Sequence, residues 1–298
     1  MNAKLLGHLA CFIAYSIFGI NIIVCKDLTS GHLISPIALF CLRSMGAGAL
    51  FWLISLFLPS EQVEKKDFVK IFFASVLGFF LTQITFLMAI PDITPMDCSI
   101  VSAISPILTM FIAAFALKEP ITLRKAGGVA LSFFGIIFLI LNSVSVSDDS
   151  RQTTLQGILL IIANCLSFSL YLGLFKPLIA RYSVVTFMKW IFLFAACVST
   201  PLSIKGLTEV DWAGIPSIQY AELAYLIICA TFISYFLIPV SQKRIRPTLV
   251  SMYSYVQPII AIVISIVIGM EILTWQKVLA AALVFGGVVI VSKSRSRQ

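Results

Sequence analysis

The stretch that decides the fold is "QPIIAIVISIVIGMEILT", residues 257–274, because it repeats the pattern of "SPILTMFIAAFALKEPIT", residues 105–122. Each stretch places a proline inside an apolar run, and each ends shortly after a glutamate. An offset of 152 residues superimposes Pro106 on Pro258 and Glu119 on Glu271. This shared spacing predicts that the chain contains the same structural unit twice.

The composition indicates a protein that lies in a membrane. Of the 298 residues, 60% are hydrophobic and 11% are charged, against roughly 25% charged in a soluble domain. The apolar runs lack the alternating pattern of a membrane barrel, so we predict an all-α polytopic membrane protein. The runs predict ten transmembrane helices, near residues 5–25, 36–58, 68–90, 96–117, 125–141, 155–175, 184–204, 222–240, 248–270 and 277–292.

Two repeats of five helices each are predicted, over residues 1–145 and 150–298. An odd number of helices makes the second copy enter the membrane from the opposite side, so the repeats are expected to be inverted. Inverted repeats suit a carrier that opens to either face in turn. The fifth and tenth runs are short and rich in small residues. We interpret them as scaffold helices or as a homodimer contact.

Lysine and arginine residues gather in alternate connecting segments, such as 65–70, 118–125 and 243–246. The positive-inside rule therefore predicts that the N- and C-termini are both cytoplasmic. The net charge of +8 does not indicate nucleic-acid binding, because the basic residues lie at helix ends rather than on a soluble basic domain.

The sequence favours no cofactor or metal. The seven cysteines are dispersed among the apolar runs without CxxC pairs, which is typical of small packing residues. No GxxxxGK[ST] motif is present, so direct use of ATP is not expected. The two histidines lie near membrane edges, which makes an intramembrane enzyme the least favoured class.

Pro106 and Pro258 lie near the middle of their spans and are predicted hinges. Each removes a backbone donor and frees the carbonyl four residues earlier, at Ser102 or Ser254. Such a pair in lipid is tolerated where the helices face a polar cavity. The candidate substrate-binding residues at this depth are Asn21, Arg43, Gln83, Ser102, Asn164, Tyr171, Tyr253, Ser254 and Gln257.

Alternatives remain open for several of these residues. Serine and threonine hydroxyls commonly bond the backbone of their own helix. Arg43 fits either a structural ion pair or the attraction of an anionic substrate. Asp97, Glu119 and Glu271 are candidates for ion coupling. For the two glutamates, a role in capping the helices that follow is favoured over ion coupling.

Five segments together resemble the EamA-type family of the drug/metabolite transporter superfamily: "FGINIIVCK" at 18–26, "ALFCLRS" at 38–44, the block at 105–135, "GILLIIANCLSFSLY" at 157–171 and the block at 257–287. The resemblance implies a ten-helix carrier of amino acids, other metabolites or drugs, often outward. It also implies a central cavity formed without the fifth and tenth helices. Phe18, where the family often has tryptophan, and Leu279, where glycine is usual, depart from the pattern.

The sequence therefore predicts a secondary carrier in the bacterial inner membrane. It is expected to export or exchange a small metabolite, with an amino acid or related amphiphile as the favoured class. The alternatives are a passive channel, a multidrug exporter and, least favoured, an intramembrane enzyme. The expected partners are a small-molecule substrate, membrane lipid and a second copy of the chain.

Overall fold

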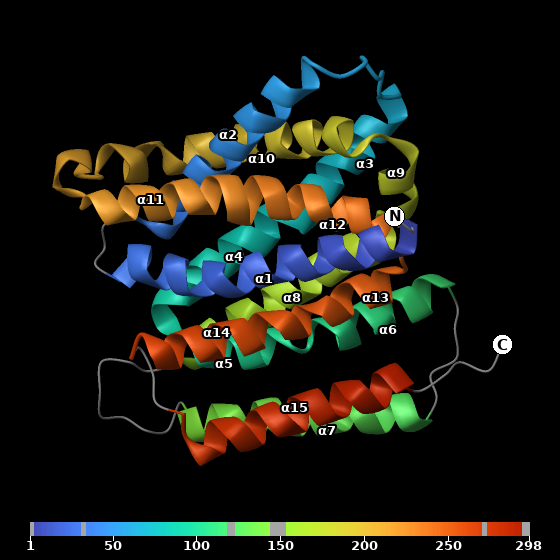
Figure 1. Ribbon diagram of the computed structural model, residues 1–298, viewed down its shortest axis with the longest axis vertical. Coiled ribbons are helices and arrows are strands. Elements are labelled where there is room, and N and C mark those ends of the chain that lie inside the picture. The colour runs from blue at the N-terminus through green and yellow to red at the C-terminus, as the bar shows by residue number, and fades with distance from the viewer. Residues whose placement is uncertain (1–2, 31–33, 118–122, 144–152, 270–272, 294–298) are drawn as a thin grey trace.

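The computed structural model describes residues 3–30, 34–117, 123–143, 153–269 and 273–293, and every regular element in these ranges is helical (Figure 1). The first part of the chain forms α1 Ala3–Ser30, α2 Pro36–Ser55, α3 Lys65–Ser75, η1 Val76–Phe80, α4 Leu81–Ala89, η2 Ile90–Asp92, α5 Pro95–Ser102, α6 Ser105–Leu117 and α7 Leu123–Ser143. The helices run side by side, and their connections lie at the two ends of the molecule.

The second part of the chain follows a similar order. It forms α8 Leu155–Leu174, α9 Lys176–Arg181, α10 Val184–Thr208, η3 Trp212–Gly214, α11 Ser217–Tyr225, η4 Leu226–Ile233, α12 Ser234–Gln242, α13 Pro247–Met252, η5 Tyr253–Tyr255, α14 Val256–Val267 and α15 Trp275–Lys293. Several helices begin at a hydroxyl cap. Ser35, Thr94 and Thr154 each accept a hydrogen bond from a backbone N–H in the first turn.

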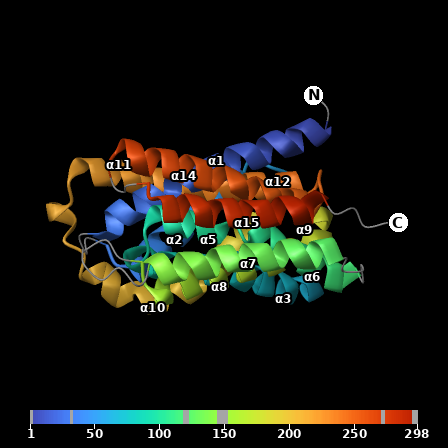
Figure 2. The same ribbon diagram turned by 90° about the horizontal axis from the view of Figure 1, so that it is seen from below.

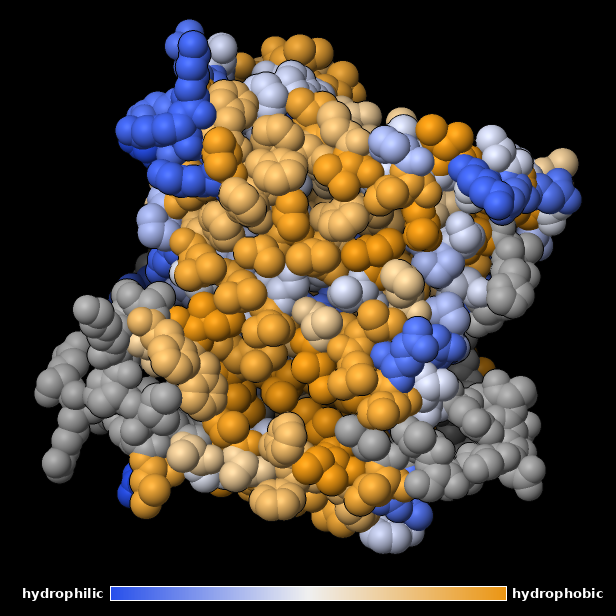
Figure 3. All heavy atoms as spheres, turned by 180° about the vertical axis from the view of Figure 1, so that it is seen from behind, coloured by the Kyte–Doolittle hydropathy of each residue, from blue (hydrophilic) through white to orange (hydrophobic). Residues whose placement is uncertain are grey.

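The chain is an all-α polytopic membrane protein. Within the described ranges, eight helical stretches are long and apolar enough to cross a membrane. They are Ala3–Thr29, Pro36–Ser55, Lys65–Asp92, Pro95–Ile112, Leu155–Leu174, Val184–Thr208, Ser217–Gln242 and Leu249–Val267. On the face drawn in Figure 3, apolar side chains make up most of the middle, and the most hydrophilic ones gather toward the two ends of the helices.

The remaining two predicted spans correspond to α7 and α15, which lie side by side at one edge of the molecule (Figures 1 and 2). The apolar stretch of α7, Ala126–Leu139, is shorter than the eight spans. Small residues let these two helices approach closely. A Cβ atom on Gly287 would lie 2.7 Å from the backbone nitrogen of Ser132, and the Ser132 hydroxyl donates to the Val284 carbonyl at 3.0 Å.

Helices α1 and α8 run in opposite directions. The Lys26 ammonium, near the end of α1, donates to the carbonyls of Ile90 and Pro91. The start of α8 lies at the same end of the molecule, where the Thr154 N–H donates to the Asp92 carbonyl at 2.8 Å. The first helix after residue 150 therefore enters the bundle from the end at which α1 leaves it.

The spans that contain Pro106 and Pro258 are both interrupted shortly before the proline. Ala103 and Ile104 separate α5 from α6, and the 3-10 turn η5 separates α13 from α14. Since Pro106 cannot donate to the Ser102 carbonyl, that oxygen needs another partner. The Cys165 thiol of α8 supplies it at 3.8 Å, which holds the broken helix against α8.

Two π-helical turns occur at corresponding positions, η1 between α3 and α4 and η4 between α11 and α12. The wider turn leaves carbonyls without an α-helical donor, and hydroxyl groups take their place. Thr82 donates to the Leu77 carbonyl and Thr231 donates to the Leu226 carbonyl, each at 2.7 Å. Sequence reasoning gave no signal for these turns.

An ionic network joins the start of α3 to the segment after α9, at the end of the molecule that carries the N-terminus. The buried carboxylate of Asp67 accepts from Arg181 Nη1 at 2.6 Å and from the Tyr182 hydroxyl at 2.8 Å. Arg181 also donates to Glu64 at 2.7 Å. A hydrogen bond from Lys66 holds the pKa of the Glu64 carboxyl below its usual value, with Arg181 adding to the effect.

Candidate functional site

A cavity lies between α1, α4, the α5–α6 break, α8, α12 and the η5–α14 junction. The empty space between its walls is about 590 Å³, a figure that includes the part open to solvent. Its polar lining residues are Asn21, Thr82, Gln83, Ser102, Ser105, Asn164, Ser254 and Gln257. Among the described residues that line it, none is charged and none belongs to α7 or α15.

The cavity brings together six of the residues that the sequence nominated for substrate binding. They are Asn21, Gln83, Ser102, Asn164, Ser254 and Gln257. Separate helical spans from both halves of the chain contribute these side chains, and Ser102 and Ser254 do so because they precede the two prolines at the helix breaks. The predicted hinge positions and the cavity therefore lie next to one another.

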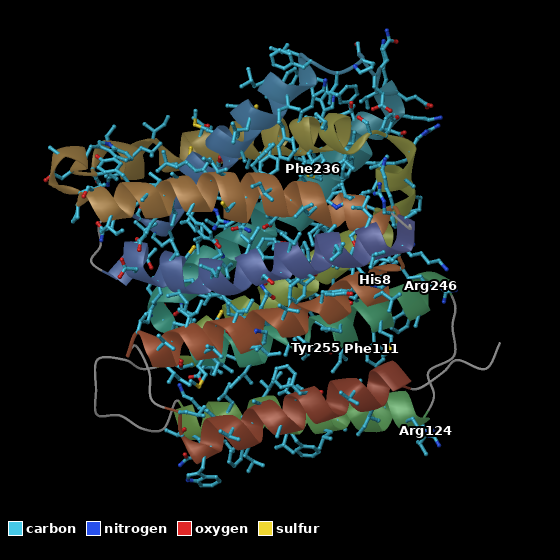
Figure 4. The ribbon with its side chains drawn as sticks, in the orientation of Figure 1. His8, Phe111, Arg124, Phe236, Arg246 and Tyr255 are labelled. Carbon is cyan, nitrogen blue, oxygen red and sulfur yellow. The ribbon has the colours of Figure 1, made fainter. Side chains whose placement is uncertain are left out.

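Three nominated residues lie away from the cavity lining. Arg43 is fully buried behind the lining and donates to the Thr231 hydroxyl at 2.8 Å. Tyr171 packs its ring between Phe168 and Phe175. The Tyr253 hydroxyl is hydrogen-bonded to His8 Nδ1 at 2.9 Å, at the end of the molecule where the chain begins (Figure 4).

The order of residues in the polar run 253–257 explains why Tyr253 lies outside the cavity lining. Successive residues of a helical turn point in different directions, so a dense polar run cannot face one cavity throughout. Tyr255 stacks edge-to-face on Phe285 of α15 (Figure 4). Ser254 and Gln257 alone, from this run, line the cavity.

The three candidates for ion coupling have different positions. Glu119 and Glu271 lie outside the described residues. Asp97 is buried near the start of α5, where Thr153 donates to its Oδ2 at 2.5 Å and Lys277 Nζ lies 3.3 Å from its Oδ1. This network links α5, α15 and the segment before α8, and Asp97 does not line the cavity.

We predict that Asp97→Asn destabilises the protein by about 3 kcal/mol, since it removes a carboxylate charge that is almost fully buried against the Lys277 ammonium. The measurement is the thermal unfolding midpoint of the purified protein. Glu209→Gln is the control, because the Lys205–Glu209 pair is exposed and is expected to contribute little. An unchanged midpoint together with a flattened pH profile of transport would instead assign Asp97 to proton coupling.

A hydrogen bond joins α4 and α12 in the cavity wall. Gln83 Nε2 donates to the Tyr235 hydroxyl at 2.7 Å, while Gln83 Oε1 is buried without a partner in the described structure. On the α8 side, Asn164 Nδ2 donates to the Thr82 carbonyl at 2.6 Å. Both amides are thus held through their NH₂ groups.

Aromatic and apolar residues complete the lining: Tyr15, Phe18, Ile22, Phe86, Phe168 and Tyr235. Sequence reasoning chose site residues by polarity, so it passed over the apolar residues Phe18, Ile22, Phe86 and Phe168. A usable signal existed, because Phe18 and Ile22 share a helical face with Tyr15 at spacings of three and four residues. Together the lining offers flat apolar faces beside uncharged hydrogen-bonding groups.

Comparison with known proteins agrees with this architecture. The model of the EamA-like transporter family matches residues 5–141 and again residues 155–293. The chain belongs to this family. A solved crystal structure superposes with a TM-score of 0.66 over 98% of this chain and 96% of its own, at 19% identity, which shows the shared fold.

Curated relatives of this EamA-family chain are described as transporters. An uncharacterised transporter of Archaeoglobus fulgidus is 23% identical over 89% of this chain and 92% of its own length. An S-adenosylmethionine/S-adenosylhomocysteine transporter of Chlamydia muridarum is 25% identical over 76% of this chain and 73% of its own. The protein is accordingly a membrane transporter with a small-molecule substrate, and its family relationships indicate a non-enzymatic role.

Proposed function

We propose that this protein is a secondary carrier that moves an amino acid or a related amphiphile across the inner membrane by alternating access. The cavity carries the proposal. It is lined from both halves of the chain by uncharged polar groups and aromatic faces, and it adjoins two broken helices. A solute with a polar head and an apolar body matches that mixture.

The conformational change rests on two inverted halves, residues 1–145 and 150–298, which rock about the cavity. Pro106 and Pro258 serve as hinges, because the breaks beside them already interrupt the helical hydrogen bonds. The opposite directions of α1 and α8 support this division of the chain. Each half then supplies one gate, which is the arrangement that alternating access requires.

We further propose an orientation and a direction of transport. The excess of lysine and arginine in alternate segments supports cytoplasmic N- and C-termini, and we assign net export. A homodimer through α7 and α15 is part of the proposal, because exposed apolar residues such as Phe133 and Phe134 lie on this helix pair. One relative is named as a transporter of S-adenosylmethionine and S-adenosylhomocysteine. Both compounds are amino-acid derivatives and fall within the proposed class.

Counterflow in reconstituted vesicles tests the carrier assignment. Vesicles are loaded with unlabelled L-phenylalanine, L-methionine or S-adenosylhomocysteine, and entry of the same labelled compound is followed. A carrier gives transient accumulation of label above the external concentration. A channel gives only equilibration, and protein-free vesicles give neither result. Equilibration without a transient overshoot for every compound that enters would reject the carrier in favour of a channel.

A further inference from the structure

Arg43 of α2 is a buried cation without a counter-ion in contact. Its side chain is 0% exposed, its Nε donates to Thr231, and its Nη2 has no partner in the described structure. None of the ion pairs between described residues involves Arg43. A buried charge is strongly unfavourable unless an opposite charge or several hydrogen bonds meet it. The described residues therefore do not supply the anion that would balance the charge of Arg43.

A short chain of contacts leads from Arg43 to the cavity. Arg43 Nη1 lies 3.6 Å from Cys25 Sγ, and Cys25 Sγ donates to Asn21 Oδ1 at 3.6 Å. Since the thiol occupies the amide oxygen of Asn21, the amide NH₂ of that residue is left for the cavity that Asn21 lines. Arg43 thus lies directly behind a hydrogen-bond donor of the wall.

The same wall offers a second donor. The Tyr235 hydroxyl accepts the bond from Gln83 Nε2, so its own proton is available to a solute. The charge of Arg43 also acts on this hydroxyl. Asn21 belongs to α1 and Tyr235 to α12, and these two helices pack against each other. The α1–α12 wall is therefore the donor side of the cavity, with a positive charge behind it.

The α8 side of the cavity offers an acceptor. Asn164 uses its NH₂ group on the Thr82 carbonyl, which leaves its Oδ1 to accept. Asn164 belongs to α8, which packs against α4. Donors backed by a buried cation on the α1–α12 wall, with an acceptor on α8, match the two ends of a zwitterion.

We propose that Arg43 makes the α1–α12 wall the carboxylate-binding side of the cavity, so that the transporter selects solutes with a carboxylate beside an apolar or aromatic body. This inference rests on the proposed carrier function and defines its substrate class. The ammonium group of an amino acid lies toward Asn164, and its side chain lies against the aromatic lining residues. Arg43 is a positioning residue, because it acts through Asn21 and Tyr235 rather than by lining the cavity.

One neighbouring feature supplies a competing explanation for the charge. Cys25 experiences the charge of Glu222 as well as that of Arg43, and the Glu222 carboxyl lies near that of Asp27. Arg43 could then serve to balance this carboxyl pair. The pair forms no ion pair with Arg43 among the described residues, which favours the solute as the missing anion.

The test compares acids with their carboxamides in counterflow on the full-length protein. The probes are L-phenylalanine and L-methionine, each against its carboxamide, which keeps the ammonium and the side chain but loses the carboxylate. Wild type is expected to transport the acids in preference. Arg43→Gln is expected to weaken the apparent affinity for the acids by about 10-fold, because the charge behind the two donors is lost, and to leave the carboxamides unaffected.

Matched variants separate charge from packing. Arg43→Lys keeps the charge and is expected to restore most of the preference for acids. Lys189→Gln removes a cation that lies over the Trp52 ring, away from the cavity, and is expected to change nothing. If Arg43→Gln does not fold, Asn21→Asp retains Arg43 but adds a carboxylate to the wall, and it is expected to shift the preference toward the carboxamides.

Three results would overturn the assignment while leaving the carrier intact. The first is a wild-type preference for the carboxamides. The second is an equal loss of apparent affinity for acids and carboxamides in Arg43→Gln, with no change of preference in Asn21→Asp. The third is a loss of apparent affinity in Glu222→Gln that equals the loss in Arg43→Gln. The third result would assign Arg43 to the Asp27–Glu222 pair. Absence of counterflow for every acid and carboxamide would reject the substrate class and the proposed function together.

Discussion

Replacing Gly78 by alanine is expected to cost about 3 kcal/mol of the free energy of unfolding, the upper range for overpacking a core. A Cβ atom at this position would lie 2.6 Å from Cγ and 2.8 Å from Cε2 of Tyr171. Gly78 belongs to the π-helical turn η1, and the Tyr171 ring is held between two phenylalanines, so neither side can yield easily. The thermal unfolding midpoint in detergent measures the loss.

A double-mutant comparison makes this prediction specific. In a Tyr171→Ala background the added methyl group has room, so Gly78→Ala should then cost little. Gly127→Ala is the matched glycine control, because a Cβ there meets nothing within 4 Å and alanine favours the helix by about 1 kcal/mol. If Gly78→Ala lowered the free energy of unfolding equally in both backgrounds, the need for glycine at position 78 would not come from the Tyr171 ring.

Replacing Ser102 by tryptophan is expected to abolish transport without unfolding the protein. Ser102 is half-buried at the end of α5 and lines the cavity, where the α5–α6 break leaves its side chain facing open space. The indole would fill the volume that a solute must occupy, so counterflow should fall to the level of protein-free vesicles. The thermal unfolding midpoint should stay close to that of the wild type.

The control for this variant adds the same side chain on the outside. Ile259 is 62% exposed on α14, so Ile259→Trp places an indole on the outer, apolar surface. Transport by Ile259→Trp is expected to equal that of the wild type. If Ser102→Trp transported normally, the solute would have to pass elsewhere, and the cavity would lose its assigned role.

The fold was largely predictable, because the strongest signals in the sequence are long apolar runs and a repeated proline spacing. Each signal lies within a short stretch of sequence, and the membrane environment determines what such an apolar stretch forms. The prediction therefore needs no knowledge of tertiary contacts. The short runs near residues 125–141 and 277–292 also indicated that α7 and α15 would stand apart from the cavity. The π-helical turns were missed, since nothing in single-sequence periodicity distinguishes one inserted residue in an apolar run.

The cavity lining was partly predictable by depth and composition, but the direction of each side chain was not. Asn21 and Asn164 were nominated because an amide in mid-membrane is rare and costly, and both line the cavity. Tyr171 has the same polarity at a similar depth, yet it turns into the core against Gly78. Which way a side chain points depends on the neighbour that makes room for it, and that neighbour is distant in the sequence.

Accessibility of a cavity residue from both membrane faces tests the central claim most directly. Ser102→Cys, in a variant whose seven native cysteines are replaced, would be treated with a membrane-impermeant thiol reagent in right-side-out and in inside-out vesicles. Ile259→Cys, on the outer surface of the bundle, should not react from either side. The account predicts that the thiol introduced by Ser102→Cys is labelled from both faces and is protected by a transported solute. Labelling from one face only, whether or not solute is being exchanged, would contradict it.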